Sequence, residues 1–198
     1  MDRYVVGITG ASGVIYGKRL VELLLERGSP SGMGCEIFLM VTDPAKEVFK
    51  QELGIDDINA CFEGFKNLHF MDYHDLTMSI ASGSFKIKAM IVIPCSMSTL
   101  SAIACGNSNN LLERAADVAI KERRQLVLVP RETPLSEIHL KNMLVLRSMG
   151  VDIVPAMPPF YANPVTIDEL VDAMVNKVLS VLGIDTGYEW QGCMGKKA

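Results

Sequence analysis

The chain has 198 residues, of which 49% are hydrophobic and 21% are charged, and its formal net charge is -4. This length and composition predict one globular domain and exclude disorder, collagen and coiled coil as the main state. The slightly acidic balance indicates no nucleic-acid partner, because nucleic-acid binding usually needs a basic face. The longest apolar runs, such as residues 89–94, are far shorter than a membrane span of roughly 18 residues, so we expect no membrane segment.

The cysteines and histidines indicate neither a disulfide framework nor a metal site. The five cysteines are odd in number and form no C-x-x-C pair, and the three histidines are scattered along the chain. The N-terminus enters a strand-like run at once, so we expect no signal peptide. We therefore expect a cytoplasmic protein, kept reduced, without a bound metal.

Apolar runs of strand length alternate with segments of helical spacing along the whole chain. Strands are expected at residues 4–9, 36–42, 67–70, 90–94, 126–130 and 153–155. Helices are expected at residues 14–26, 45–53, 99–105, 111–123, 135–149 and 167–182. This alternation predicts parallel strands with crossover helices, and strands that are apolar on both faces predict a sheet covered on both sides. We therefore expect an α/β chain with a three-layer Rossmann-like fold and a mostly parallel sheet.

Small residues follow the first expected strand, at Gly10, Ala11, Ser12 and Gly13, and lead into the first helix. Ligands of such sheets lie beyond the carboxyl ends of the strands, and a helix N-terminus offers free N–H groups to a phosphate. The spacing is not G-x-G-x-x-G, so the dinucleotide fingerprint is missing. A tight turn is the alternative, but the position in the first crossover favours ligand binding.

Three hydroxyl residues, Ser96, Ser98 and Thr99, follow the fourth expected strand. Serine and threonine are common caps at helix starts, but three in four positions are more than one cap needs. A cradle for a phosphate or a polar ring is therefore an equally good interpretation. The neighbouring Cys95 is weak evidence for a nucleophile, because free cysteines are commonly buried.

Arg131 and Glu132 lie between two prolines directly after the fifth expected strand. Proline makes the loop rigid, arginine can bind a phosphate through two parallel hydrogen bonds, and glutamate can act as a general acid or base. A simple surface ion pair between Arg131 and Glu132 is an equally good interpretation.

Further charged and polar residues have both a structural and a functional interpretation. Arg114 and Lys121 are seven apart and share one helix face, which is either solvated or able to hold a phosphate dianion. The loop at residues 81–85 is either a flexible turn or an anion-binding lid. Tyr161 follows a Pro-Pro turn and Lys177 lies in the last helix, where packing and simple exposure are the alternatives.

In this order, the segments resemble the UbiX-type flavin prenyltransferases, part of the wider superfamily of homo-oligomeric flavin-containing decarboxylase-like proteins. Each segment alone is modest evidence, but their combination over residues 4–183 is highly specific. The segments are residues 10–13, 81–84, 94–97, 114–122, 128–135, 138–143 and 160–161.

The resemblance implies one flavin-binding domain at residues 1–185, a C-terminal tail at residues 186–198, and assembly into a large homo-oligomer, usually a dodecamer. It implies transfer of a dimethylallyl group from dimethylallyl monophosphate to N5 and C6 of reduced FMN, without a metal. The product, prenylated FMN, would then serve a UbiD-type decarboxylase. Whether the donor is a monophosphate or a diphosphate stays open.

The resemblance also implies site residues. FMN contacts are expected at Gly10, Ala11, Ser12, Thr42, Ser96, Met97, Ser98, Thr99 and Arg131. Contacts to the prenyl donor are expected at Ser82, Gly83, Arg114, Lys121, Tyr161 and Lys177, and we expect the fold to bring the last four to one cleft. Ser12 and Glu132 are the candidate catalytic residues near flavin N5, and Glu52 is the candidate near the leaving phosphate. Trp190 resembles a C-terminal tryptophan that lies near the site in some members.

Two other functions stay open. An FMN-dependent decarboxylase of cysteine-type substrates commonly carries a histidine after the first strand and a Pro-x-Met-Asn motif. Here residues 94–97 read Pro-Cys-Ser-Met and no histidine precedes His69, which argues against that function. The other is a non-catalytic flavin-carrying subunit of a hydroxyarylate decarboxylase, against which the presence of Ser12, Glu132 and Lys121 favours an active enzyme.

Overall fold

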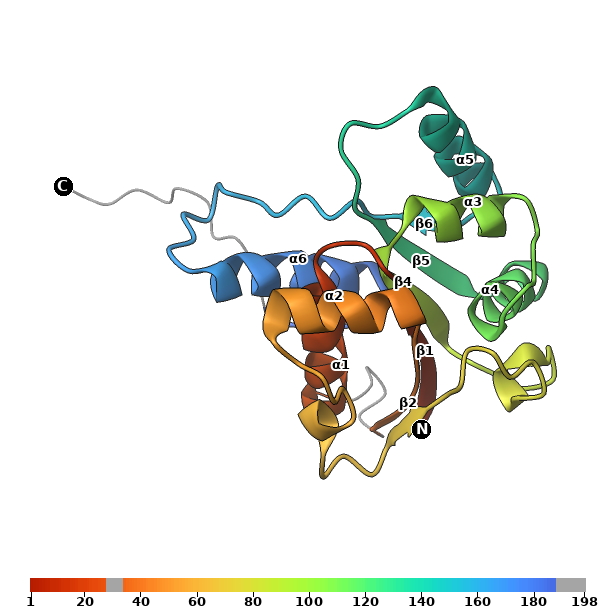
Figure 1. Cartoon of the computed structure of the whole chain (residues 1–198), viewed down its shortest axis with the longest axis horizontal. Coiled ribbons are helices and arrows are strands. Elements are labelled where there is room, and N and C mark those ends of the chain that lie inside the picture. Colours follow the sequence, from red (N-terminus) through yellow and green to blue (C-terminus); the bar gives the residue numbers. More distant parts are fainter. Residues whose placement is uncertain (28–33, 188–198) are drawn as a thin grey trace.

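The computed structural model describes residues 1–27 and 34–187, in which strands and helices alternate as expected (Figure 1). The strands are β1 (Asp2–Ile8), β2 (Cys35–Val41), β3 (Leu68–Phe70), β4 (Ala89–Cys95), β5 (Gln125–Pro130) and β6 (Asp152–Ile153). The α-helices are α1 (Val14–Arg27), α2 (Asp43–Leu53), α3 (Met97–Ala104), α4 (Leu111–Lys121), α5 (Glu137–Ser148) and α6 (Ile167–Val181). Two short 3-10 turns, η1 (Ala60–Phe62) and η2 (Ser79–Ala81), were not expected from the sequence.

All six strands form one parallel sheet in the order β3-β2-β1-β4-β5-β6. The chain builds outward from β1 through β2 to β3 and then returns to the other side of β1 to form β4. The topological switch point therefore lies between β1 and β4, where the loops after these two strands diverge. The predicted three-layer Rossmann-like arrangement with a parallel sheet is confirmed.

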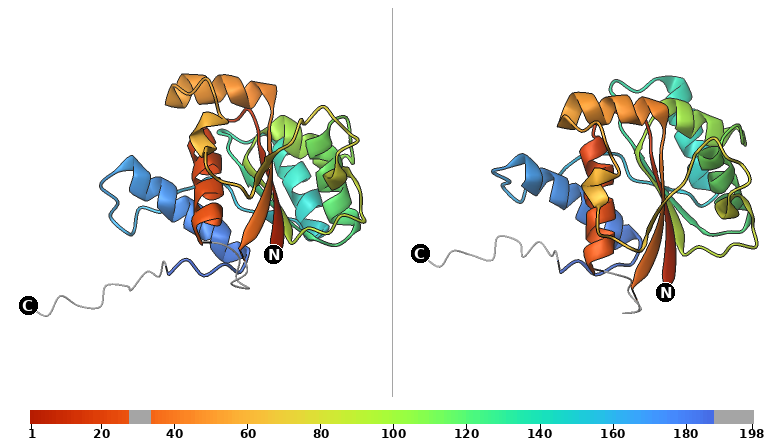
Figure 2. Two further views of the ribbon diagram at one scale, coloured as in Figure 1. Left: turned by 90° about the horizontal axis from the view of Figure 1, so that it is seen from below. Right: turned by 60° about the horizontal axis from the view of Figure 1, so that its bottom comes forward.

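Helices cover both faces of the sheet, as Figure 2 shows. Leu20 of α1 and Val175 of α6 are fully buried on one face, where α2 also packs. Leu100 of α3, Leu112 of α4 and Leu146 of α5 are buried on the other face. The four central strands β1, β2, β4 and β5 therefore bury apolar side chains on both sides, which explains why they read as continuous apolar runs, whereas the edge strands β3 and β6 are only partly buried.

Two regions leave large apolar side chains exposed. In α5, Ile138 and Leu144 are 68% and 70% exposed. In the segment before α6, Met157 and Phe160 are 70% and 69% exposed. Exposed apolar surface of this kind is typical of faces that contact another protein.

No helix of residues 1–27 and 34–187 is long and apolar enough to span a bilayer. The described cysteines, which are Cys35, Cys61, Cys95 and Cys105, are free thiols. Trp190 and most of the expected tail lie outside the described residues.

Candidate functional site

Four loops lie side by side at the carboxyl edge of the sheet, after β2, β1, β4 and β5. The backbone N–H of Thr42 donates to the carbonyl oxygen of Ile8 at 3.1 Å. The backbone N–H of Arg131 donates to the carbonyl oxygen of Cys95 at 3.4 Å. The expected FMN contacts lie in these four loops and in the first turn of α3, so the fold brings that set of residues together.

A threonine that the sequence analysis missed joins the two central loops. Thr9 is buried, and its Oγ1 donates to the carbonyl oxygen of Pro94 at 2.8 Å and accepts from the N–H of Ser96 at 2.8 Å. The only sequence signal was a polar residue at the end of an apolar run, which is common where a strand ends. The loop after β1 is thereby bound to the loop after β4.

The small residues after β1 have a packing reason. A Cβ atom at Gly10 would lie 2.5 Å from Cβ of Pro44, so glycine lets this loop pass close to the start of α2. Ala11 is almost fully buried beside it. A loop without bulky side chains at its surface also lets a ligand approach the backbone closely.

Glu52 extends from the end of α2 to the start of α1. Its Oε2 accepts from the N–H of Gly13 at 2.9 Å and from the N–H of Val14 at 3.3 Å. These first N–H groups of α1 are therefore already bonded to a carboxylate, and ligand binding by the small-residue loop stays a prediction. The same contact places Glu52 beside the small-residue loop, and burial together with its charge raises the pKa of Tyr16 nearby.

Hydroxyl groups cluster at the start of α3. Ser96 is the helix cap, since its Oγ accepts from the N–H of Thr99 at 3.3 Å. The Oγ of Ser96 also lies 3.0 Å from the Oγ of Ser98 and 3.0 Å from the Oγ1 of Thr99. The cap interpretation is confirmed for Ser96, and two further hydroxyls lie beside it; a cradle for a phosphate or a polar ring stays a prediction. Met97 is buried in the core, which leaves mainly its backbone for a ligand.

Two caps coincide with expected FMN contacts. Thr42 caps α2 by accepting from the N–H of Ala45 at 3.3 Å, as Ser96 does for α3. Losing such a cap costs about 0.5–2 kcal/mol of stability. Both residues therefore have a structural role, whatever they contact in a ligand.

Arg131 and Glu132 do not share their hydrogen bonds. Nε of Arg131 donates to the carbonyl oxygen of Ser12 at 3.3 Å, which joins the loop after β5 to the small-residue loop. Oε1 of Glu132 accepts from the N–H of Thr133 at 3.0 Å, and Glu132 is exposed. The alternative of a simple surface ion pair between them loses support, because each group has a different partner.

A second group of expected residues lies where α4 meets the loop at residues 81–85. Nε of Arg114 donates to the carbonyl oxygen of Ala81 at 3.2 Å, and a Cβ atom at Gly83 would lie 2.9 Å from Nζ of Lys121. Arg114 and Lys121 therefore share the face predicted from their spacing, with Gly83 against it. Arg124, just after α4, joins the same group: it donates to the carbonyl oxygen of Phe85 at 2.7 Å and also to the carbonyl oxygen of Gly83.

Ionic contacts accompany this second group. Nη1 of Arg114 lies 2.8 Å from Oδ2 of Asp117, and Lys121 pairs with Glu122. The pairing with Lys121 lowers the pKa of Glu122. Ser82 and Ser84 lie beside these pairs, with their Oγ atoms 2.9 Å apart. Hydroxyls and cations at one loop suit an anion such as phosphate.

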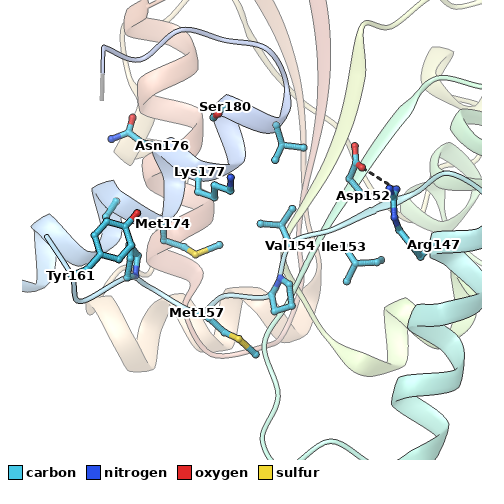
Figure 3. Close-up of a pocket in the computed structure, with 14 residues that line it drawn as sticks. Arg147, Asp152, Ile153, Val154, Met157, Tyr161, Met174, Asn176, Lys177 and Ser180 are labelled. Atoms are coloured by element: carbon cyan, nitrogen blue, oxygen red, sulfur yellow. Dashed lines mark hydrogen bonds and ion pairs between the residues drawn. The ribbon is translucent and has the colours of Figure 1, made fainter. Parts of the chain in front are cut away.

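Tyr161 and Lys177 line a third region, a pocket of about 710 Å³ between β6 and α6. Figure 3 shows Lys177 extending from α6 toward the wall that carries Val154, with Tyr161 in the loop before α6. Met157 and Met174 add apolar surface.

One chain does not bring the four expected phosphate contacts into one cleft. Arg114 and Lys121 belong to α4, which packs on one face of the sheet, whereas Lys177 belongs to α6 on the opposite face. The sheet itself separates the two groups. The sequence could not show this, because the face that a helix covers depends on the side on which each crossover passes.

No group of histidine, cysteine and carboxylate side chains among residues 1–27 and 34–187 could hold a metal ion. Cys95 is fully buried, and burial raises the pKa of its thiol far above its usual range. A thiol in that state is a poor nucleophile, because the thiolate is the reactive form.

Comparisons with known proteins match the whole described fold. The family model described as Flavoprotein covers residues 1–179. A flavin prenyltransferase UbiX of Halalkalibacterium halodurans is 50% identical over 191 residues, with 92% of this chain and 89% of that protein covered. A dodecameric FMN-dependent UbiX-like decarboxylase from Escherichia coli O157:H7 is 42% identical, with a TM-score of 0.86 over 96% of this chain and 99% of that one. AnUbiX, solved in complex with FMN and dimethylallyl pyrophosphate, is 38% identical, with a TM-score of 0.86 over 96% and 98%.

The burial of Cys95 predicts that its thiol is unreactive in the folded protein, which can be tested. Iodoacetamide should leave Cys95 unmodified in the folded protein and modify it after denaturation, because burial keeps the thiol protonated and out of reach. Cys35 is also buried, and burial raises its pKa to about 11. It should therefore show the same protection in the folded protein and is the internal control for loss of the fold. Peptide mass spectrometry reads both sites. Equally fast modification of Cys95 before and after denaturation would mean that the loop after β4 opens and exposes a reactive thiol.

Proposed function

The chain belongs to the flavoprotein family, as one of its UbiX-type flavin prenyltransferases, and we propose that it joins a dimethylallyl group to N5 and C6 of reduced FMN. The observation that carries this proposal is the row of four hydrogen-bonded loops at the switch point of the sheet. A backbone without bulky side chains, a hydroxyl cluster and a guanidinium group meet there. Residues 1–185 act as one domain, because one sheet carries both helix layers.

The donor set of the four loops suits FMN. The hydroxyls of Ser96, Ser98 and Thr99 at the start of α3, together with Arg131, suit a phosphate and the polar edge of a flavin. The close approach that Gly10 permits suits a flat ring against the backbone. Thr42 and Ala11 border the same region. When bound, reduced FMN supplies the nucleophilic positions that take the prenyl group.

The chemistry asks for an acid–base group and an anion-stabilising pole. Breaking the prenyl C–O bond leaves a phosphate. The two flavin positions that gain carbon would each lose a proton, one of which balances the proton added to the prenyl double bond and the other the proton taken up by the phosphate. Glu132 and Ser12 lie on loops that Arg131 joins, so they are the groups placed to move a proton near the flavin. Glu52 lies at the other end of the small-residue loop, where the leaving phosphate is expected.

The group of residues expected to bind the donor phosphate, here called the phosphate pole, needs a second copy of the chain. Its members are Arg114, Lys121, Tyr161 and Lys177. Arg114 and Lys121 are on the opposite side of the sheet from Lys177 and Tyr161, so one chain supplies only half of the cluster at a time. The exposed apolar residues of α5 and of the segment before α6 offer surface that a homo-oligomer would cover. A dodecamer, the assembly of the UbiX-like decarboxylase from Escherichia coli O157:H7, would place several copies together.

The donor is proposed to be dimethylallyl monophosphate and the product to serve a UbiD-type decarboxylase. AnUbiX was solved with dimethylallyl pyrophosphate, so both phosphates belong in the assay. The free cysteines of the described residues support a reducing compartment, and we place the protein in the cytoplasm.

The proposed function has a direct test. Protein supplied with FMN, a chemical reductant and dimethylallyl monophosphate should yield a flavin whose mass has increased by the prenyl unit. The same incubation with dimethylallyl pyrophosphate decides the donor preference. Bound FMN without any mass increase with either donor would favour a flavin-carrying subunit, and release of carbon dioxide from a cysteine-type substrate would favour the decarboxylase.

Replacing Glu132 should affect turnover and not flavin binding. Glu132→Gln removes the acid–base group but keeps the shape and a hydrogen-bond acceptor for the N–H of Thr133. We expect prenyl transfer to slow by roughly 10²–10⁴-fold with FMN affinity unchanged. Glu63→Gln, an exposed glutamate beside η1, is the matched control and should turn over like the parent. If Glu132→Gln turns over like the parent too, another group moves the proton.

Variants mixed within one oligomer test whether two copies build the phosphate pole. Lys121→Ala and Lys177→Ala should each abolish turnover, and co-assembly of the two should restore roughly a quarter of it, because some sites then receive both intact lysines. Lys121→Ala mixed with Arg114→Ala is the control, because both changes lie on the same helix and no site regains both groups. Equal activity of the two mixtures would contradict a pole built from two copies.

A further inference from the structure

Thr9 continues the pairing of β1 with β4 beyond the end of the sheet. The paired rungs between these strands end at Gly7 and Val92. Thr9 then donates twice to the carbonyl oxygen of Pro94, through its N–H at 3.2 Å and through its Oγ1 at 2.8 Å. The same Oγ1 accepts from the N–H of Ser96 at 2.8 Å.

This contact needs a side-chain hydroxyl, whereas the backbone contacts between the neighbouring loops and strands do not. The loop after β2 is joined to β1, and the loop after β5 to β4, by bonds between backbone groups, which any residue other than proline can make. Between the two central loops, the bond to the N–H of Ser96 needs a side-chain hydroxyl at Thr9. On its other side, the end of β4 is not held by regular pairing, because its register with β5 shifts between Val92 and Cys95.

The position of the hydroxyl cluster follows from this bond. Ser96 donates its N–H to Oγ1 of Thr9, and its own Oγ lies 3.0 Å from the Oγ of Ser98 and 3.0 Å from the Oγ1 of Thr99. Thr9 is also the residue directly before Gly10. One buried oxygen atom therefore joins the small-residue loop to the start of the hydroxyl cluster, in addition to the backbone bond from Thr9 to Pro94.

We propose that Thr9 is a positioning residue for the flavin: its hydroxyl holds the loops after β1 and β4 at the spacing that FMN requires. Thr9 itself is 1% exposed and acts through Ser96. The inference rests on the proposed function only in taking these loops as the FMN site. Valine has nearly the same shape but would leave the N–H of Ser96 without its acceptor at Thr9, so the loop after β4 would lose this bond to the loop after β1.

The test compares Thr9→Val with Thr9→Ser, which keeps the hydroxyl. FMN titration by fluorescence should show affinity about tenfold weaker in Thr9→Val, with a shifted absorption spectrum of the bound flavin, and affinity near the parent value in Thr9→Ser. Leu24→Ala is the control for general loss of stability, because Leu24 is buried in α1 away from the loops. It should unfold more easily and still bind FMN like the parent.

Amide exchange gives a second measurement that needs no flavin. The N–H of Ser96 should exchange slowly in the unliganded parent protein and in Thr9→Ser, and faster in Thr9→Val if that variant folds. Parent-like FMN affinity and spectrum in Thr9→Val, equal loss in Thr9→Ser, or fast exchange at Ser96 in the parent would each overturn the proposal. None of these readings involves prenyl transfer, so an absence of turnover in a protein that binds FMN counts against the proposed function alone.

Discussion

The parallel pairing of β1 with β4 is the constraint on which the rest of the site depends. The chain reaches β4 only after completing β2 and β3 on the other side of β1, so the crossovers after β1 and β4 leave in opposite directions. The small-residue loop and the hydroxyl cluster are the first residues of these two crossovers. They become neighbours because their strands pair. The paired rungs end before the two loops begin, and the bonds of Thr9 join the loops beyond that point.

The same crossovers divide the charged residues. The connection that carries α4 passes over one face of the sheet, and the final helix α6 returns to the other face. The fold thus brings the four loops proposed for FMN together within one chain but separates Lys121 from Lys177. A reaction that needs both a flavin and a phosphate pole therefore couples catalysis to assembly, and the exposed apolar side chains of α5 supply a physical reason for that assembly.

Much of this fold can be predicted from local sequence patterns, because burial determines which segments are apolar. Strands with helices on both faces must be apolar throughout, so residues 90–94 and 126–130 identify β4 and β5 without any tertiary information. Caps such as Ser96 are local as well. The contacts of Glu52 could not be predicted in this way. Its bonds to Gly13 and Val14 join α2 to α1, and no residue spacing within α2 indicates them. Thr9 reads as an ordinary strand end until the partner strand is known.

Glu52 also narrows where an anion can bind. The sequence offers two helix starts to a phosphate, those of α1 and α3, and both lie beside the switch point. At α1 the first N–H groups already bind the carboxylate of Glu52, and a second anion there would meet a like charge at close range. At α3 the neighbours are neutral hydroxyls, with Arg131 on the loop after β5. The charge distribution therefore favours α3 for the flavin phosphate. It leaves Glu52 at the opposite end of the small-residue loop, bound to the N–H groups of Gly13 and Val14.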